Sequence, residues 1–266
     1  MPTFRGNRGN LLQHWVLVEL LDALHHKHVS ELCFVDAYSM SPRPTRSPKV
    51  VTDQTAADFD RVLARLKQGP SAYERAWLSL SRSLGSDYPS SASFVRHCWE
   101  GQAHLLLCEA DRDTASDIAT WLSGVDASTT SFELYQGDWR GRFRRGIPTT
   151  FGAYYLSFDP NMYDRHDVRI PKPENMYPSD LPIVTAAIEG ILELPIVIQL
   201  STYSVNGANG QPDVFDNVAP VFSRHRFEAG YVRADNAMMS MLFTRGTPMV
   251  SDLENRFRSW LTGRKG

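Results

Sequence analysis

The residues best suited to chemistry are acids that follow short apolar segments of the chain. Asp159 comes directly after the apolar run 153–158, and Pro160 comes next. Proline has no N–H group and favours an extended conformation in the residue before it, so we expect Asp159 at the end of a strand. A carboxylate at that point, beside the carbonyl group of Pro160, can accept hydrogen bonds from an amino group. The alternative is an ordinary strand that ends in an Asp-Pro turn.

Three further acids occupy similar places after other apolar runs. They are Asp36 at the end of 32–36, Glu109 after 103–108, and Asp138 shortly after 131–135. Ligands bind outside the carboxyl ends of strands in open α/β sheets, so acids at that edge suit the hydroxyl and amino groups of a nucleoside. For one acid alone, the alternative is a charge that favours the start of the next helix. The series of four is more specific than any one member.

A cluster of arginines follows the run 131–135. Arg140, Arg142, Arg144 and Arg145 surround Phe143. Arginines with an interleaved aromatic ring suit a phosphate backbone and a stacked base, so they predict nucleic-acid binding. The alternative is a solvated basic loop. The formal net charge is −2, so any nucleic-acid binding has to use such a local patch.

Alternating strands and helices would bring these residues together. The segment 11–28 contains no proline or glycine and is apolar around most of its circumference, which predicts a core helix with Asn10 as its N-cap. Other helices are predicted at 53–69, 71–84, 113–122, 179–194 and 253–261, with one more opening at 88–91. Further strands are predicted at 195–200, 218–222 and 238–243, the last two as an antiparallel edge. This alternation predicts a Rossmann-like, doubly wound α/β sheet of about seven strands.

Composition places the chain among ordinary globular proteins, with 42% hydrophobic and 22% charged residues. Cys33, Cys98 and Cys108 lack zinc spacing and cannot all pair, so reduced thiols and a reducing compartment are expected. A metal site at His25–His28 would lack acidic or cysteine partners, so no metal is predicted. No run of about 18 apolar residues occurs, and the amino terminus does not have the pattern of a signal peptide. We therefore expect a cytoplasmic protein without membrane contact.

Several short motifs are shared with a known family. They are Gly6-Asn7-Arg8-Gly9-Asn10 with Gln13-His14, Phe34-Val35-Asp36, Tyr88-Pro89-Ser90-Ser91, Cys108-Glu109 and Asp159-Pro160. Through them the chain resembles the class I methyltransferases, and more narrowly the bacterial 23S ribosomal RNA adenine-N6 methyltransferases, from Gly6 to about Phe243. The resemblance implies one methyltransferase-like domain over 1–266, with a small helical insert at 52–85. It also implies S-adenosylmethionine as the cofactor.

The resemblance implies roles for the matching residues. The cofactor-binding residues would be Asn7, His14, Asp36, Ser91, Glu109 and Asp138, with Glu109 on the ribose and Asp138 on the adenine. The catalytic residues would be Asp159, Pro160 and Asn161. The Asp159 carboxylate and the Pro160 carbonyl would accept the hydrogens of a target adenine's amino group, turning its lone pair toward the methyl group.

The chain departs from the family pattern at this same edge. Ser39-Met40-Ser41-Pro42 replaces a glycine-rich loop, and Asp159-Pro160-Asn161-Met162 replaces an Asp-Pro-Pro-aromatic motif. Tyr163 is the nearest aromatic residue that could stack on a target base instead. Gln13 stands where the family has lysine, and Asn10 where it has aspartate. The resemblance implies an S-adenosylmethionine-dependent methyltransferase acting on an amino group, such as adenine N6 in RNA or DNA. The alternative is an inactive methyltransferase-like protein that binds nucleic acid or a protein partner.

Overall fold

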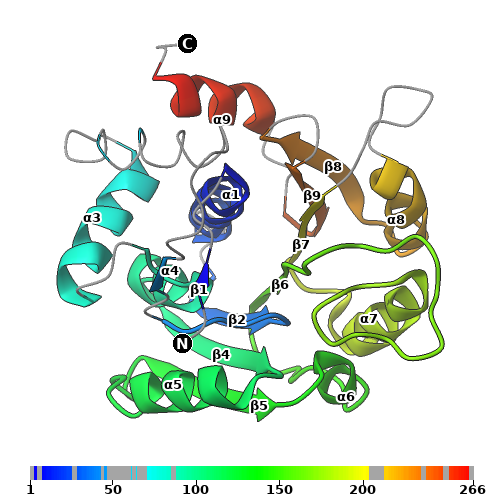
Figure 1. The fold of residues 1–266 in the computed structure, drawn as a ribbon, viewed down its shortest axis with the longest axis horizontal. Coiled ribbons are helices and arrows are strands. Elements are labelled where there is room, and N and C mark those ends of the chain that lie inside the picture. Colours follow the sequence, from blue (N-terminus) through cyan, green and yellow to red (C-terminus); the bar gives the residue numbers. More distant parts are fainter. Residues whose placement is uncertain are drawn as a thin grey trace.

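The structure is a computed structural model, and it describes residues 3–4, 8–25, 29–42, 45–46, 61, 64, 71–84, 88–203, 213–234, 238–247 and 252–263. These residues form a central sheet with helices on both faces (Figure 1). Asn7 and most of the helix predicted at 53–69 lie outside the described residues. None of the helices in the described ranges is both long and apolar enough to span a membrane.

The central sheet has seven strands in the order β5-β4-β2-β6-β7-β9-β8. They are β2 (Glu31–Asp36), β4 (Gln102–Glu109), β5 (Thr130–Gln136), β6 (Ala153–Phe158), β7 (Ile196–Tyr203), β8 (Glu228–Arg233) and β9 (Met238–Arg245). The strands from β5 to β7 are parallel, whereas β9 runs antiparallel to β7 and β8. A separate parallel pair joins β1 (Thr3–Phe4) to β3 (Thr45–Arg46). The predicted Rossmann-like, doubly wound α/β sheet of about seven strands is confirmed.

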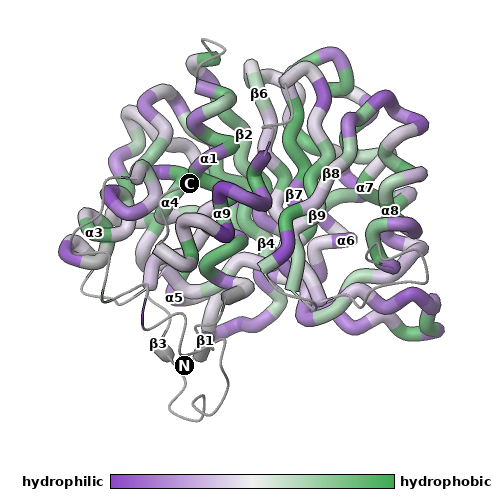
Figure 2. The backbone as a smooth tube through the Cα atoms, turned by 90° about the horizontal axis from the view of Figure 1, so that it is seen from above, coloured by the Kyte–Doolittle hydropathy of each residue, from purple (hydrophilic) through white to green (hydrophobic). Residues whose placement is uncertain are grey.

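Helices cover both faces of this sheet. The helices are α1 (Arg8–His25), α3 (Ala72–Leu84), α4 (Ser91–Cys98), α5 (Arg112–Leu122), α6 (Trp139–Phe143), α7 (Leu181–Ile188), α8 (Asp213–Ser223) and α9 (Leu253–Thr262). One hydrophobic cluster joins the sheet to α1, α3, α4, α5 and α9, and a second joins it to α6, α7 and α8. Figure 2 shows hydrophobic residues concentrated along the central strands, as a parallel sheet buried on both faces requires.

The helix α1 is a core helix, as its sequence predicts. Its side chains from Leu11 to Val18 are all buried, and Leu20, Leu21 and Leu24 are buried as well. Asn10, however, lies within the helix, because α1 begins at Arg8. The predicted N-cap role of Asn10 is therefore wrong.

Side-chain caps explain where several other helices begin. The Ser90 side chain accepts a hydrogen bond from the Ser93 N–H group at the start of α4. Asp111 does the same for Thr114 at the start of α5, at 2.8 Å. Each cap satisfies an N–H group that has no partner within its helix. The strand ends and helix starts at the carboxyl edge are thus fixed by local chemistry.

Two predicted elements differ from the structure. The segment 218–222, predicted as a strand, lies within α8, and the outer antiparallel strand is β8 instead. The buried residues of α8 are Val214, Val218 and Phe222, and this spacing of four is helical. The five apolar residues 218–222 span little more than one helical turn, so they do not reveal a spacing of four residues. The helix predicted at 179–194 is divided into the 3₁₀ helices η2 (Pro178–Asp180) and η3 (Glu189–Ile191), with α7 between them.

Most of the described part of the predicted helical insert is α3. Its residues Tyr73, Trp77 and Leu80 are buried in the same hydrophobic cluster as α1 and α4. Tyr73 stacks on Phe94 of α4, with ring centroids 5.4 Å apart. The helix therefore packs as part of the main domain, while the boundaries 52–85 stay a prediction.

The three cysteines are free thiols. Cys33 and Cys108 are buried, as their apolar surroundings predict. Burial raises the pKa of the Cys33 thiol to about 12, so this group is neutral and unreactive at neutral pH.

Candidate active site

A cavity of about 890 Å³ opens at the carboxyl edge of the sheet. Its walls come from the ends of β4, β6 and β7, the loops after β2 and β5, and the start of β9 and α1. The chain runs from β2 outward to β5 and then returns to β6 on the other side of β2, so strand order reverses between β2 and β6. Ligands of doubly wound sheets bind at such a reversal, and the volume is typical of a small-molecule site.

Three of the four predicted acids line this cavity. They are Glu109, Asp138 and Asp159, each at or just after the end of its strand. Asp36 is 4% exposed and is not part of the lining. Its carboxylate accepts a hydrogen bond from the Tyr38 N–H group at 3.2 Å, so its own loop encloses it. The sequence predicted the convergence of these acids, but Asp36 is not placed to contact a cofactor directly.

Side-chain alternation explains the convergence. Phe34 and Leu107, two residues before Asp36 and Glu109, belong to the hydrophobic cluster beneath α1. Successive side chains of a strand point to opposite faces, so Asp36 and Glu109 project from that same face. Asp159 is close enough to Asp36 to perturb its ionisation. These carboxyl groups therefore lie on the same face and at the same edge of the sheet.

Burial makes these carboxyl groups unusually basic. It raises the pKa of Asp36, of Glu109 and of Asp159 to about 7 in each case. The charges of Asp159 and Glu109 raise the pKa of Asp36 further, while the Tyr38 N–H group opposes the rise. A hydrogen bond from the Gln13 side chain opposes the rise in the pKa of Asp159. The cavity therefore changes charge close to neutral pH.

The loop after β2 has no glycine, and its first three N–H groups bond within the protein. The acceptors are the Ser157 carbonyl for Ala37 at 3.0 Å, the Asp36 carboxylate for Tyr38 at 3.2 Å, and the Cys108 carbonyl for Ser39 at 2.9 Å. These N–H groups are therefore not available to bind an anionic group of a ligand, as those of a glycine-rich loop do. The start of α1 supplies a different positive element, because Gly9 and Asn10 line the cavity and a helix N-terminus carries partial positive charge.

The Tyr38 side chain lines the cavity, and the Trp139 side chain is buried next to it. The Trp139 indole N–H group donates to the Tyr38 hydroxyl at 2.9 Å, and this hydroxyl donates to the Asn175 carbonyl at 3.0 Å. Both residues belong to the lining. Sequence reasoning missed them, although an aromatic residue two or three positions after a strand at this edge was a usable signal. These hydrogen bonds hold the half-buried Tyr38 ring in place, and a flat ring of a ligand can stack on a fixed aromatic side chain.

His14 and Ser91 form a buried pair behind the cavity instead of lining it. The Tyr88 hydroxyl donates to the Asn10 carbonyl at 2.6 Å, so it accepts from Nδ1 of His14. Nε2 of His14 then accepts from the Ser91 hydroxyl at 2.9 Å. Burial lowers the pKa of His14 to about 3, so the ring is neutral. The predicted cofactor contacts of His14 and Ser91 are corrected: these side chains fix α1 against α4.

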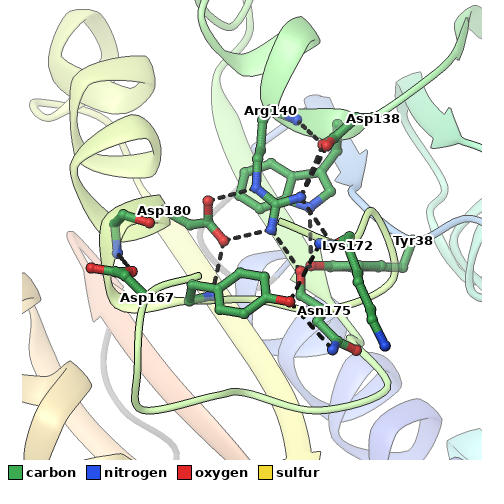
Figure 3. Close-up of polar contacts among 10 residues, drawn as sticks. Tyr38, Asp138, Arg140, Asp167, Lys172, Asn175 and Asp180 are labelled. Carbon is green, nitrogen blue, oxygen red and sulfur yellow. Dashed lines mark hydrogen bonds and ion pairs between the residues drawn. The ribbon is translucent and has the colours of Figure 1, made fainter. Parts of the chain in front are cut away.

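Arg140 holds the loop between β6 and α7, as Figure 3 shows. Its Nε and Nη2 atoms donate to the Asp180 carboxylate at 2.6 and 2.7 Å. Its Nη1 atom donates to Asp138 at 3.1 Å, and its remaining contacts are the carbonyl groups of Asn175 and Lys172. The Arg140 side chain is 4% exposed. Its role is structural, because its donors are engaged within the protein and do not face a phosphate.

The other predicted arginines divide into two kinds. The Arg142 side chain is 8% exposed and makes a double hydrogen bond with Glu133, at 2.6 and 2.8 Å. Arg144 and Arg145 are exposed, with Arg145 lying over the Tyr135 ring. The predicted patch is thus corrected for Arg140 and Arg142, and nucleic-acid binding stays a prediction for Arg144 and Arg145.

Asp159, Pro160 and Asn161 lie together on the cavity wall, as the sequence predicts. The Asn161 N–H group donates to the Glu174 carbonyl at 2.8 Å. Because Glu174 belongs to the loop that Arg140 holds, this bond ties the residues after β6 to that loop. The arrangement presents a carboxylate with raised pKa beside a fixed backbone.

Tyr163 does not replace the missing aromatic residue of the family motif. It is 5% exposed and packs in the hydrophobic cluster of α7 and α8. Its N–H group donates to the Thr202 hydroxyl at 3.0 Å, which fixes it beside β7. Met162 is exposed but does not line the cavity. The expectation that Tyr163 stacks on a ligand is wrong.

Comparison with solved structures finds one with the same fold over most of both chains, and weaker similarities to others. No protein-family model matches the chain, and no curated protein matches it either. Protein LPL1258 from Legionella pneumophila, of the family described as DUF519, is similar in structure with a TM-score of 0.59 and 13% identity, over 96% of this chain and 91% of that one. MNMC2 from Aquifex aeolicus has a TM-score of 0.43 and 13% identity, over 95% and 65% of the two chains. An rRNA methylase from Streptococcus thermophilus has a TM-score of 0.37 and 14% identity, over 88% and 94%.

Within the described residues, no group of three or more His, Cys, Asp or Glu is placed to hold a metal ion.

Proposed function

We propose that the protein is an S-adenosylmethionine-dependent methyltransferase acting on an amino group, with adenine N6 in RNA or DNA as its target. The observation that carries this proposal is the charge of the cavity wall. Its described lining residues include Glu109, Asp111, Asp138, Asp159 and Glu174 but no lysine, arginine or histidine. S-adenosylmethionine has a sulfonium and an ammonium group but only one carboxylate, so its net charge is positive. A cavity lined by acids attracts such a ligand.

The cavity residues after β4 and β5 and at the start of α1 fit the parts of such a ligand. Glu109 follows β4, where a carboxylate suits ribose hydroxyls. Asp138 follows β5 and suits an adenine amino group, with the Tyr38 ring on the same cavity wall. The positive end of α1, at Gly9 and Asn10, suits the carboxylate.

The residues after β6 suit the target amine. Bound S-adenosylmethionine would supply an electrophilic methyl group. The Asp159 carboxylate and the Pro160 carbonyl would accept the two amino hydrogens and so orient the nitrogen lone pair, which is catalysis by positioning. With a pKa of about 7, Asp159 is also suited to take up the proton that the methylated amine releases.

A second candidate is an inactive methyltransferase-like protein that binds nucleic acid or a protein partner. The observation that favours it is the loop after β2. The N–H groups of Ala37, Tyr38 and Ser39 are all bonded within the protein, so this loop offers them to no ligand.

Calorimetric titration separates the two candidates. We expect wild-type protein to bind S-adenosylmethionine and S-adenosylhomocysteine at micromolar concentrations. A label from the methyl group should then appear in single-stranded adenine-containing oligonucleotides. The absence of heat at millimolar ligand contradicts the methyltransferase proposal and supports the inactive candidate.

A further inference from the structure

The cavity has two chemically different halves, on either side of the reversal in strand order between β2 and β6. The half near β4 and β5 carries most of the acids and the ring of Tyr38. The half near β6, β7 and β9 contains Asp159 with the ends of β7 and β9, whose lining side chains are uncharged. If the first half holds the cofactor, this second half receives the target.

Tyr203 is the aromatic residue of the target half. It is the last residue of β7, it lines the cavity, and it is 46% exposed. Its Cα partner across the antiparallel β7–β9 pair is Met238, which lines the cavity as well. Side chains opposite each other on a β-ladder stand side by side, so the two residues form one wall.

The pleat of β7 directs Tyr203 toward the face of the sheet that carries Asp159. Gln199, four residues earlier, donates from its side-chain amide to the Gln13 carbonyl of α1 at 3.0 Å. Alternate residues of a strand share a face, so Tyr203 projects from the α1 face too. Gln13 also hydrogen-bonds to Asp159, which places that carboxylate on the same side.

Tyr203 also lies beside the residues proposed to hold the amine. Phe158, the last residue of β6, has Leu200 of β7 as its Cα partner. Farther along, the Tyr163 N–H group donates to the Thr202 hydroxyl. The segment after β6 therefore runs along the end of β7, with Tyr203 on the adjacent strand.

We propose that Tyr203 is a specificity-determining residue whose ring stacks on the flat ring that carries the target amino group. This inference rests on the proposed function. The aromatic residue missing after Asp159-Pro160 is supplied by the neighbouring strand, because Tyr163 is buried elsewhere and, in the described part of the wall on this side, Tyr203 is the aromatic side chain. A base stacks on such a ring only when it is single-stranded or turned out of a duplex.

The test compares Tyr203→Phe and Tyr203→Ala with the wild-type protein. Phe132→Ala is the matched control, because Phe132 is 44% exposed on the edge strand β5 and does not line the cavity. The first probe is a single-stranded oligoribonucleotide with one 2-aminopurine, whose fluorescence reports stacking. We expect Tyr203→Ala to weaken its binding roughly 5- to 150-fold, while Tyr203→Phe and Phe132→Ala stay within about threefold of wild type.

Methyl transfer to single-stranded oligoadenylate gives the second readout. We expect Tyr203→Ala to lower kcat/KM for the oligonucleotide by the same factor, with an unchanged melting temperature and an unchanged affinity for S-adenosylhomocysteine. A role in folding alone would change the melting temperature and not the oligonucleotide KM.

The outcomes separate this inference from the proposed function. If wild-type protein binds no S-adenosylhomocysteine and transfers no methyl group, the proposed function fails, and the 2-aminopurine probe still decides the role of Tyr203. Equal probe binding by wild type and Tyr203→Ala overturns the stacking inference, as does a wild-type protein that does not bind the probe. Equal loss in Tyr203→Ala and Tyr203→Phe also overturns it, because the hydroxyl and not the ring would then be responsible.

Discussion

Asp36 and Asp159 end neighbouring parallel strands, yet the structure gives them different surroundings. Asp159 lines the cavity, while Asp36 is enclosed by the loop after β2. Burial raises the pKa of both carboxyl groups to about 7. A raised pKa in a cavity is useful for proton transfer, whereas a raised pKa in an enclosed group only opposes folding. We therefore expect substitutions at the two positions to act on activity and on stability, respectively.

Replacement of Asp159 by Asn should lower methyl transfer by at least about 100-fold, because the amide offers one acceptor atom fewer and cannot take up a proton. The affinity for S-adenosylmethionine should stay within about threefold. Wild-type activity should rise as pH increases through about 7, where Asp159 ionises, and the variant should lack that step. Rates and calorimetry from pH 5.5 to 8.5 check this. Asp164→Asn, on the same loop but outside the cavity lining, is the control; an equal loss in both variants would contradict the role of Asp159.

Replacement of Asp36 by Asn should stabilise the protein at pH 8 and have little effect at pH 4. The pKa of Asp36 is raised from 3.8 to about 7, so the native state binds more protons than the unfolded state between these values. Its contribution to stability is therefore lost as pH rises through this window. The gain for the variant should be about 1–3 kcal/mol at pH 8. Urea unfolding at several pH values measures it.

The difference between variant and wild type isolates Asp36 from other groups. His14 acts in the opposite direction, because its lowered pKa of about 3 makes the protein lose stability as pH falls below about 6.5. That effect is common to both proteins and cancels in the comparison. If the stability difference between Asp36→Asn and wild type does not change with pH, the raised pKa of Asp36 is refuted.

At the scale of elements, α6 joins the two walls of the cavity. Asp138 caps this helix by accepting from the Arg140 N–H group at 3.0 Å. Through its ion pair with Asp180, Arg140 then fixes the end of the loop between β6 and α7. The helix has only five residues, so the ion pairs and its packing hold it in place more than helix propensity does.

Replacement of Arg140 by Met should destabilise the protein by about 3–5 kcal/mol, because the buried Asp180 carboxylate would keep its hydrogen bond from the Tyr177 N–H group but lose its positively charged partner. Arg144→Met, on the same turn of chain but exposed, should change stability by less than about 0.5 kcal/mol. Urea unfolding of both variants checks the difference. Limited proteolysis should cut Arg140→Met, and not Arg144→Met, within the loop 161–178. Equal stability of the two variants would show that the ion pair does not hold this loop.

The sequence predicted the order of strands and helices better than it predicted the environment of single side chains. Apolar runs that end in Asp36, Glu109 or Asp159 mark buried parallel strands, because local composition and turn chemistry suffice for that. The burial of Arg140 and His14 depends on Asp180 and Tyr88, which lie far away along the chain. No local pattern encodes such pairing. The helical period of α8 is local but spans Val214 to Phe222, so the five residues 218–222 alone did not reveal it.

At the scale of the whole molecule, charge is unevenly distributed. The formal net charge is only −2, yet the described cavity wall carries acids and no basic side chain. Two arginines that the sequence suggested for ligand binding neutralise Asp180 and Glu133 instead. The cavity therefore keeps a negative potential that the overall charge does not reveal.

This distribution predicts that binding of S-adenosylmethionine releases protons near neutral pH. A cationic ligand beside Glu109 and Asp159 favours their ionised forms, so it lowers pKa values that burial has raised to about 7. Affinity should therefore increase from about pH 6 to about pH 7.5. Calorimetry in two buffers of different ionisation enthalpy counts the released protons. S-adenosylhomocysteine, which lacks the sulfonium charge, should release fewer, and Asp159→Asn should reduce the number for S-adenosylmethionine. Equal proton release with both ligands would mean that the acids of the cavity do not sense the sulfonium, and the electrostatic basis of the proposed function would be lost.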